Sequence, residues 1–226
     1  MVNDDNTHYG MAFKVGRKAN KKAQAIIAEI APPKLSKLQK QNIIELANAL
    51  GIPEADINPM SYVDADQGAS NPTKDQDNCQ SCVVSYIARR RGLDCCAKGY
   101  DETNHTMFEL GEKFQNAWLD AKTGKILSPV IIRGKNDEEI ILKLKRTLSQ
   151  EGEYIVGFNG IDKDSGHVIN VTNFNGQIII HDEQICKEAD RYSDFTSFDD
   201  IDYCEIIKID KAILNINVAK EVLTKR

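Results

Sequence analysis

Apolar positions in the first part of the chain recur at helical spacing. The pattern predicts a basic helix from Met11 to Ile30, ended by Pro32-Pro33, and a second helix from about Ser36 to Leu50. The apolar stripe of the second helix comprises Leu38, Ile43, Leu46, Ala47 and Leu50. Together these segments predict a helical N-terminal extension over residues 1–56.

Polar residues and turn formers dominate the stretch from Asn58 to Asp77, which predicts an ordered loop rather than a helix or strand. A helix is expected directly after it, because Asn78 or Asp77 can cap its first turn and Gly92 is a natural stop. The three arginines before that stop, Arg89-Arg90-Arg91, are typical of a solvated helix end, where cations are favourably placed.

Further helices are predicted from Met107 to Leu119 and from Asn136 or Asp137 to Leu148. The positions expected to be buried are Phe108, Leu110, Phe114 and Trp118 in the first, and Ile140, Ile141, Leu144 and Leu148 in the second. A turn at Lys122–Lys125 separates the two helices.

Strand patterns follow, at residues 153–158, 166–172, 177–182 and 203–209. The segment from Asp210 onward fits either a strand or a helix. Helices followed by an antiparallel meander indicate an α+β fold. We therefore expect a second unit over residues 57–226, in which the helix at Asn78 packs on the sheet.

The dipeptide Asn175-Gly176 is a strong signal for a two-residue type I′ hairpin turn, and it sets a register. Phe174 then pairs with Gln177, and counting outward places His167 and Asp182 as diagonal neighbours on one face. A carboxylate in that position would orient the imidazole and stabilise its charged form. A slip of one residue would instead put His181 on the His167 face.

Cys79 and Cys82 are the two candidate nucleophiles. With Asn78 as the cap, Cys79 is the first helical residue, where unpaired N–H groups and the helix dipole favour the thiolate. The Cys79 N–H is also placed to stabilise an oxyanion. We therefore assign Cys79 as the nucleophile and Cys82 as a small packed residue, although spacing alone would allow the opposite choice.

Other interpretations of these residues stay open. Cys-x-x-Cys at a helix start also fits a thioredoxin-like redox motif, but the strand expected before that motif is replaced by a polar loop. A four-thiolate zinc site would need Cys79 and Cys82 together with the vicinal Cys95 and Cys96, an unfavourable chelating pair. We expect no metal and no cofactor, and we assign no role to Cys186 or Cys204.

Composition changes this interpretation little. The 226 residues are 41% hydrophobic and 28% charged, as in ordinary globular proteins, and the net charge of −5 does not favour nucleic-acid binding. No apolar run reaches the about 18 residues of a membrane span, and the N-terminus lacks the apolar stretch of a signal peptide. We expect synthesis in a cytoplasm with reduced thiols.

Several motifs resemble the papain-fold toxin family, the glutamine deamidase-like domains of bacterial polymorphic toxins and phage-related proteins. They are Asn78-Cys79-Gln80-Ser81-Cys82-Val83-Val84 with Arg89 to Gly92, Gly166-His167-Val168-Ile169-Asn170-Val171 and Asp182-Glu183-Gln184. The segments Ala65-Asp66, Asn71-Pro72 and Ile207-Lys208-Ile209-Asp210 are similar to the phage-related branch. The resemblance covers about residues 58–215. Glu183 departs from it, standing where the family usually has proline.

The resemblance implies a papain-like α+β catalytic domain over 57–226 with a Cys79-His167-Asp182 triad, supported at the oxyanion or strand end by Asn78 and Gln184. It implies a cysteine-dependent amidohydrolase that deamidates protein glutamine side chains, with an immunity protein as a possible partner. Delivery into a target cell or association with a phage-like particle would follow. The alternatives are a cysteine peptidase of the same fold and a non-enzymatic interaction or phage-structural module.

Overall fold

The structure is a computed structural model in which part of the chain can be described. The described residues are 26, 30–67, 69–75, 77–99, 113–161, 166–184, 192–193 and 200–226. The predicted helix from Met11 to Ile30 lies almost wholly outside them, as do Phe108, Leu110 and Cys186.

A six-stranded antiparallel sheet forms the centre of the fold. Its strands, in spatial order, are β3 (Val130–Arg133), β8 (Ile201–Lys208), β4 (Gly152–Gly160), β5 (Gly166–Phe174), β6 (Gln177–His181) and β7 (Tyr192–Ser193). The four predicted strands are confirmed as β4, β5, β6 and β8. The prediction of a simple meander is wrong, however, because β8 pairs with the side of β4 that faces away from β5. The short strands β3 and β7 form the two edges of the sheet.

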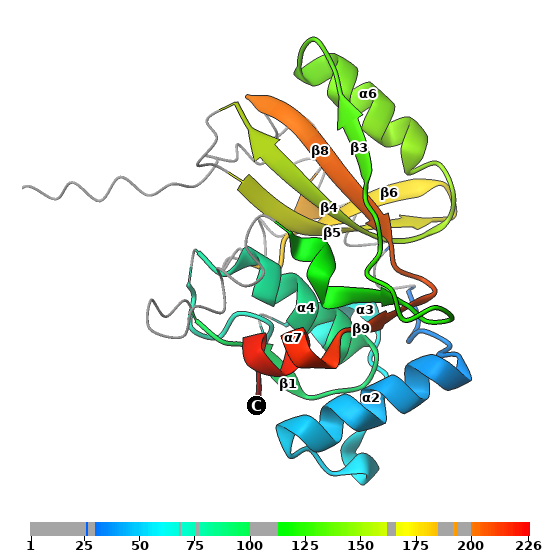
Figure 1. Ribbon diagram of the computed structural model, residues 1–226, viewed down its shortest axis with the longest axis vertical. Coiled ribbons are helices and arrows are strands. Elements are labelled where there is room, and N and C mark those ends of the chain that lie inside the picture. Colours follow the sequence, from blue (N-terminus) through cyan, green and yellow to red (C-terminus); the bar gives the residue numbers. More distant parts are fainter. Residues whose placement is uncertain are drawn as a thin grey trace, which may run out of the picture.

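Helices cover the two faces of this sheet, α6 (Asp137–Thr147) on one and α4 (Cys79–Arg90) on the other (Figure 1). The predicted cap of α6 is confirmed, because the Asn136 side chain accepts a hydrogen bond from the backbone of Glu139 at 2.9 Å. Strand alternation then gives the sheet two buried faces and the fold two apolar clusters.

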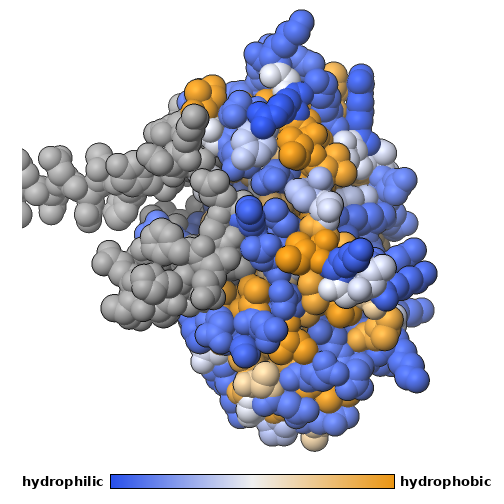
Figure 2. All heavy atoms as spheres, viewed as in Figure 1, coloured by the Kyte–Doolittle hydropathy of each residue, from blue (hydrophilic) through white to orange (hydrophobic). Residues whose placement is uncertain are grey.

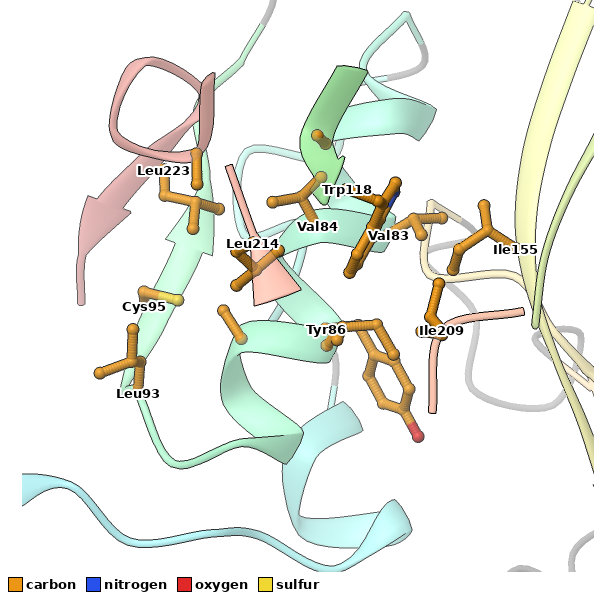
Figure 3. Close-up of a cluster of buried hydrophobic side chains, with 14 of the residues drawn as sticks. Val83, Val84, Tyr86, Leu93, Cys95, Trp118, Ile155, Ile209, Leu214 and Leu223 are labelled. Atoms are coloured by element: carbon orange, nitrogen blue, oxygen red, sulfur yellow. The ribbon is translucent and has the colours of Figure 1, made fainter. Parts of the chain in front are cut away.

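The larger cluster surrounds α4. Figure 3 shows Val83 pointing toward Ile155 of the sheet, whereas Val84 lies toward Leu214 and Leu223 near the C-terminus. The ring of Trp118 lies beside these side chains and is almost fully buried. The residues of α4 from Ser81 to Arg90 are all buried, whereas Cys79 at its start is partly exposed.

The predicted helix after Ser36 is confirmed as α2 (Lys37–Leu50), which begins in a capping box between Ser36 and Gln39. Gly51 ends it at a φ of 69°, a left-handed conformation that favours glycine. Leu38 is exposed, contrary to prediction, while Ile43, Leu46 and Ala47 join the α4 cluster. The division of the chain near residue 56 stays a prediction.

The segments after the sheet fold back onto α2 and α4, which form the helical layer of the molecule. They are β9 (Ala212–Leu214), α7 (Ile216–Val222) and β10 (Leu223–Lys225), which pair with or pack beside β2 (Trp118–Asp120), η2 (Phe114–Ala117) and β1 (Cys95–Ala97). A helix running to Leu119 was therefore a wrong prediction for its described part, because pairing with β9 holds Trp118 to Asp120 extended. Phe114 and Trp118 are nevertheless buried as expected.

The polar stretch before α4 also differs from prediction, because it contains the short helix α3 (Tyr62–Asp66), which follows η1 (Glu54–Asp56). Ser61 caps α3 by accepting a hydrogen bond from the Asp64 backbone, and Tyr62 and Ala65 are fully buried. Burial of these two apolar side chains against α4 stabilises a helix too short to form alone.

The three arginines at the end of α4 are buried rather than solvated, each only 3% exposed. Arg89 donates to the Ala65 carbonyl at 2.7 Å, and Arg90 donates to the Met60 carbonyl at 2.7 Å. Arg91 donates to the carbonyl of Ile209 at 3.1 Å. The prediction failed because tertiary carbonyl groups, invisible in the local sequence, surround this helix end.

The molecular surface in the view of Figure 2 is mostly hydrophilic, interrupted by small apolar areas. Among the described residues, none of the helices is both long and apolar enough to cross a membrane.

Candidate active site

Cys79 is the first residue of α4 and is partly exposed, as its predicted place at the helix start requires. Asn78 is the N-cap residue, but its side chain makes no capping hydrogen bond, which corrects the predicted capping role. Instead the Asn78 amide is fully buried and turns away to other partners. The Asn78 side chain therefore does not occupy the amide groups of the first turn, beside the Cys79 thiol.

The hairpin between β5 and β6 brings His167 and Asp182 together. Asn175 and Gly176 have φ values of 51° and 75°, as a type I′ turn requires. Phe174 pairs with Gln177 and Asn170 with His181, which confirms the predicted register as far as β6 extends. His167 Nε2 lies 2.7 Å from Asp182 Oδ2, so the predicted diagonal contact is present.

The side chain of Cys79 completes this arrangement, because it is also hydrogen-bonded to His167. Since Nε2 of the ring faces Asp182, Nδ1 is the nitrogen left to face the thiol. Burial alone would lower the pKa of His167. The charge and hydrogen bond of Asp182, with a smaller effect of Cys79, outweigh burial and raise that pKa well above its ordinary value.

Both carboxylate oxygens of Asp182 have partners. Oδ2 faces His167, and Oδ1 accepts a hydrogen bond from the Gln184 backbone N–H at 3.1 Å. This Asx-type turn holds the carboxylate directed at the imidazole. Gln184 therefore supports the site through its main chain, a contact that was not foreseen from its side chain.

Cys82 lies one turn into α4 and is completely buried. Its thiol donates to Asn78 Oδ1 at 3.1 Å. Burial, together with the nearby Cys79 and carboxylates, raises the pKa of Cys82 well above its ordinary value. A buried thiol of this kind is a poor nucleophile, which agrees with its assignment as a packed residue.

Two groups of buried polar residues next to the site were not predicted from the sequence. Asn71 lies in the loop before α4 and hydrogen-bonds toward both Asn78 and Gln184. His181 is flanked by Asp66 at 3.5 Å and by Glu183 at 3.2 Å. Asn71 stood in a segment that resembled the toxin family, but spacing gave no indication of its partners.

The remaining described cysteines, Cys95, Cys96 and Cys204, are buried, and burial raises the pKa of each thiol. In the described parts of the chain, no group of three or more His, Cys, Asp or Glu side chains is arranged to hold a metal ion.

Comparison with known protein families found one family model that matches part of the chain. Residues 77–187 match the family model described as papain fold toxin 1, glutamine deamidase, and this span includes α4, β5, β6 and all three residues of the contact. Searches of curated proteins and of solved structures gave no match. Residues 77–187 therefore belong to the papain fold toxin 1, glutamine deamidase family, and the chain has an α+β, papain-like fold.

Proposed function

We propose that this protein deamidates glutamine side chains of a target protein, with Cys79 as nucleophile, His167 as acid and base, and Asp182 orienting His167. The observation that carries the proposal is the hydrogen-bonded series from Cys79 through His167 to Asp182. These residues come from three different parts of the fold, α4, β5 and the end of β6. Their proximity is therefore a result of tertiary structure and not of local structure. A thiol, an imidazole and a carboxylate in series are the components of cysteine-dependent acyl transfer.

In the first step the Cys79 sulfur attacks the carbon of the glutamine carboxamide. The negative charge that develops on the oxygen is stabilised by the N–H of Cys79 at the start of α4, where the helix dipole is favourable. His167, charged and held by Asp182, donates its proton to the nitrogen as the carbon–nitrogen bond breaks. Ammonia leaves, and the glutamyl group stays on Cys79 as a thioester.

In the second step neutral His167 takes a proton from water, and the resulting hydroxide attacks the thioester carbon. The carbon–sulfur bond breaks, the Cys79 thiolate is restored and pairs again with charged His167. The product is glutamate, so one carboxamide and one water have become one carboxylic acid and one ammonia. No cofactor enters this sequence.

The description of the matching family supports a carboxamide substrate and a role as a toxin. In that role the protein would be delivered into a target cell and act on a host protein, and its producer would need an immunity protein. A peptidase would use the same thioester and differ only in the amine that leaves.

A thiol-labelling experiment tests the nucleophile. Iodoacetamide at low concentration and pH 6 should alkylate Cys79 faster than free cysteine, because the adjacent His167 is hydrogen-bonded to its sulfur and activates it as a nucleophile. Peptide mapping should find this fast alkylation in the parent and in Cys82→Ala, and should find none in Cys79→Ala. Equal rates for Cys79 and free cysteine would contradict the proposal, and fast alkylation at Cys82 would reverse the assignment.

Mass spectrometry of candidate target proteins tests the reaction. Deamidation should add about 1 Da per modified glutamine to an intact chain, whereas a peptidase would release fragments. Cys79→Ala is the matched control. Cleavage that depends on Cys79 would replace the deamidase proposal with the peptidase alternative, and the absence of either reaction on any candidate would favour the non-enzymatic module.

A further inference from the structure

Asn71 lies at the junction of the two elements that carry the proposed nucleophile and its partners. It belongs to the loop between α3 and α4 and is only 6% exposed. Besides local bonds with Thr73 and Asp75, it forms two hydrogen bonds with residues 7 and 113 positions away, which the sequence does not reveal. A buried amide of this kind is stabilising only when its donors and acceptor are paired.

One side of the Asn71 amide faces the start of α4. Its Oδ1 accepts a hydrogen bond from Asn78 Nδ2 at 3.2 Å, and Thr73 donates to the same oxygen at 3.2 Å. Asn78 Nδ2 also donates to the Lys98 carbonyl at 3.2 Å, and Asn78 Oδ1 accepts from the Cys82 thiol. These bonds fix the residue that immediately precedes Cys79.

The other side of the amide faces the end of β6. Asn71 Nδ2 donates to the Gln184 carbonyl at 3.1 Å and to the Asp75 carbonyl at 2.8 Å. The N–H of Gln184 in turn donates to Asp182 Oδ1 at 3.1 Å. The Gln184 main chain therefore connects Asn71 to the carboxylate that orients His167.

We propose that Asn71 is a positioning residue, which bridges Asn78 and Gln184 and so holds the start of α4 in register with the strand end that carries Asp182. The inference rests on the proposed function. Asn71 touches neither the substrate nor the reacting atoms, and it acts by fixing the distance between the Cys79 thiol and the His167–Asp182 pair.

A positioning residue is needed because the residues of the site are divided between two elements. Cys79 is fixed by a helix, and Asp182 lies just beyond the last paired residue of β6. A small shift between helix and strand would weaken both contacts of His167, and misplacement by about 1 Å can reduce the rate of a positioned reaction by about 100-fold. A planar amide that donates to one element and accepts from the other opposes this shift.

The rate of Cys79 alkylation between pH 5 and 9 tests the inference without a known substrate. Asn71→Ala should lower the rate at pH 6 about tenfold, because the thiolate loses its aligned imidazolium. Asn42→Ala is the matched control. Asn42 is 5% exposed and bridges α2 to β9 through two 2.9 Å hydrogen bonds with Leu214, so its loss should lower the melting temperature but leave alkylation unchanged.

A double-mutant cycle separates positioning from general destabilisation. Groups that act as a unit have non-additive effects, so Asn71→Ala should cause little further loss in an Asp182→Asn background. An equal loss in both backgrounds, or a loss no greater than that of Asn42→Ala, would overturn the inference. If Asn71→Ala does not fold, Asn71→Ser is subjected to the same cycle and judged by the same outcomes.

The two proposals fail in distinguishable ways. Slow alkylation of Cys79 in the parent would overturn the proposed function and, with it, the role of Asn71. Fast alkylation in the parent that Asn71→Ala leaves unchanged would overturn the positioning role alone.

Discussion

At the scale of single residues, Cys79 and Cys82 show how position on one helix separates two chemically identical side chains. Cys79 begins α4, is partly exposed and is hydrogen-bonded to His167. Cys82 is fully buried, donates to Asn78 Oδ1 and has a raised pKa. A difference of three residues therefore distinguishes a partly exposed thiol that contacts the imidazole from a buried thiol whose pKa is raised.

The Cys82 thiol is a hydrogen-bond donor, and substitutions should report this. Cys82→Ser keeps a donor for Asn78 Oδ1, whereas Cys82→Ala leaves that buried oxygen with one partner fewer. We expect Cys82→Ser to be more stable than Cys82→Ala by about 1 kcal/mol in urea unfolding. If alanine is the more stable variant, the hydrogen bond contributes nothing and Cys82 is only a packed residue.

At the scale of secondary-structure elements, the arginines that end α4 connect that helix to its surroundings. Arg90 donates to the carbonyls of Met60 and Ala31 and lies 3.4 Å from a carboxylate oxygen of Glu153. One guanidinium therefore joins two irregular segments to β4. The planar group with its several donors makes such a junction possible, and lysine cannot reproduce it.

The element-scale prediction concerns this junction. Arg90→Lys should lower the free energy of unfolding by about 2 kcal/mol, because at least one buried carbonyl loses its donor. Arg133→Lys is the control, since Arg133 is largely exposed, pairs with Asp202 at 3.6 Å and lies over the Tyr203 ring at the edge of the sheet. Urea unfolding should show a loss of no more than about 1 kcal/mol for the control. Equal stability of Arg90→Lys and the parent would contradict the proposed importance of the buried guanidinium.

At the scale of the whole molecule, a second buried ionic group joins the helical layer to the sheet. His181 at the end of β6 is fully buried between Asp66 of α3 and Glu183, and its ring packs on Tyr62 and Tyr86. Burial would lower the pKa of His181, but Glu183 and Asp66 outweigh it and raise the pKa to about 9. For Glu183 burial acts in the opposite direction and raises the pKa of the carboxyl group, although the positive charge of His181 lowers it.

The stability of the protein should depend on pH through His181. A histidine whose pKa is raised on folding stabilises the native state fully below its unfolded pKa of about 6.5. That contribution is lost as the pH rises through the folded value of about 9. The melting temperature of the parent should therefore exceed that of His181→Gln most at pH 6, and this difference should narrow toward pH 10.

Melting curves of both proteins from pH 6 to pH 10 provide the measurement. Comparison of the two cancels the effect of net charge, which changes almost equally in parent and variant. A difference that stays constant or widens with pH would show that His181 is not a charged partner of Asp66 and Glu183 in the native state.

Local patterns in the sequence determined the elements that carry the proposed chemistry. The helical periodicity of residues 36–50 and 137–148, the helix start at Cys79 and the Asn175-Gly176 turn are all present in the structure. The turn also fixed the pairing of β5 with β6, and hence the contact of His167 with Asp182. These features follow from interactions between residues close in the chain, so the sequence displays them directly.

Tertiary structure decided where polar side chains found their partners. Asn78 turned from the expected helix cap to Asn71, and the arginines at the end of α4 became buried among distant carbonyl groups. Trp118 lies in a strand rather than a helix, because β9 pairs with its segment from about 95 residues away in the chain. Long-range pairing and burial outweigh local propensity at such positions. The conformation there depends on residues far away in the chain, so the neighbouring sequence does not predict it.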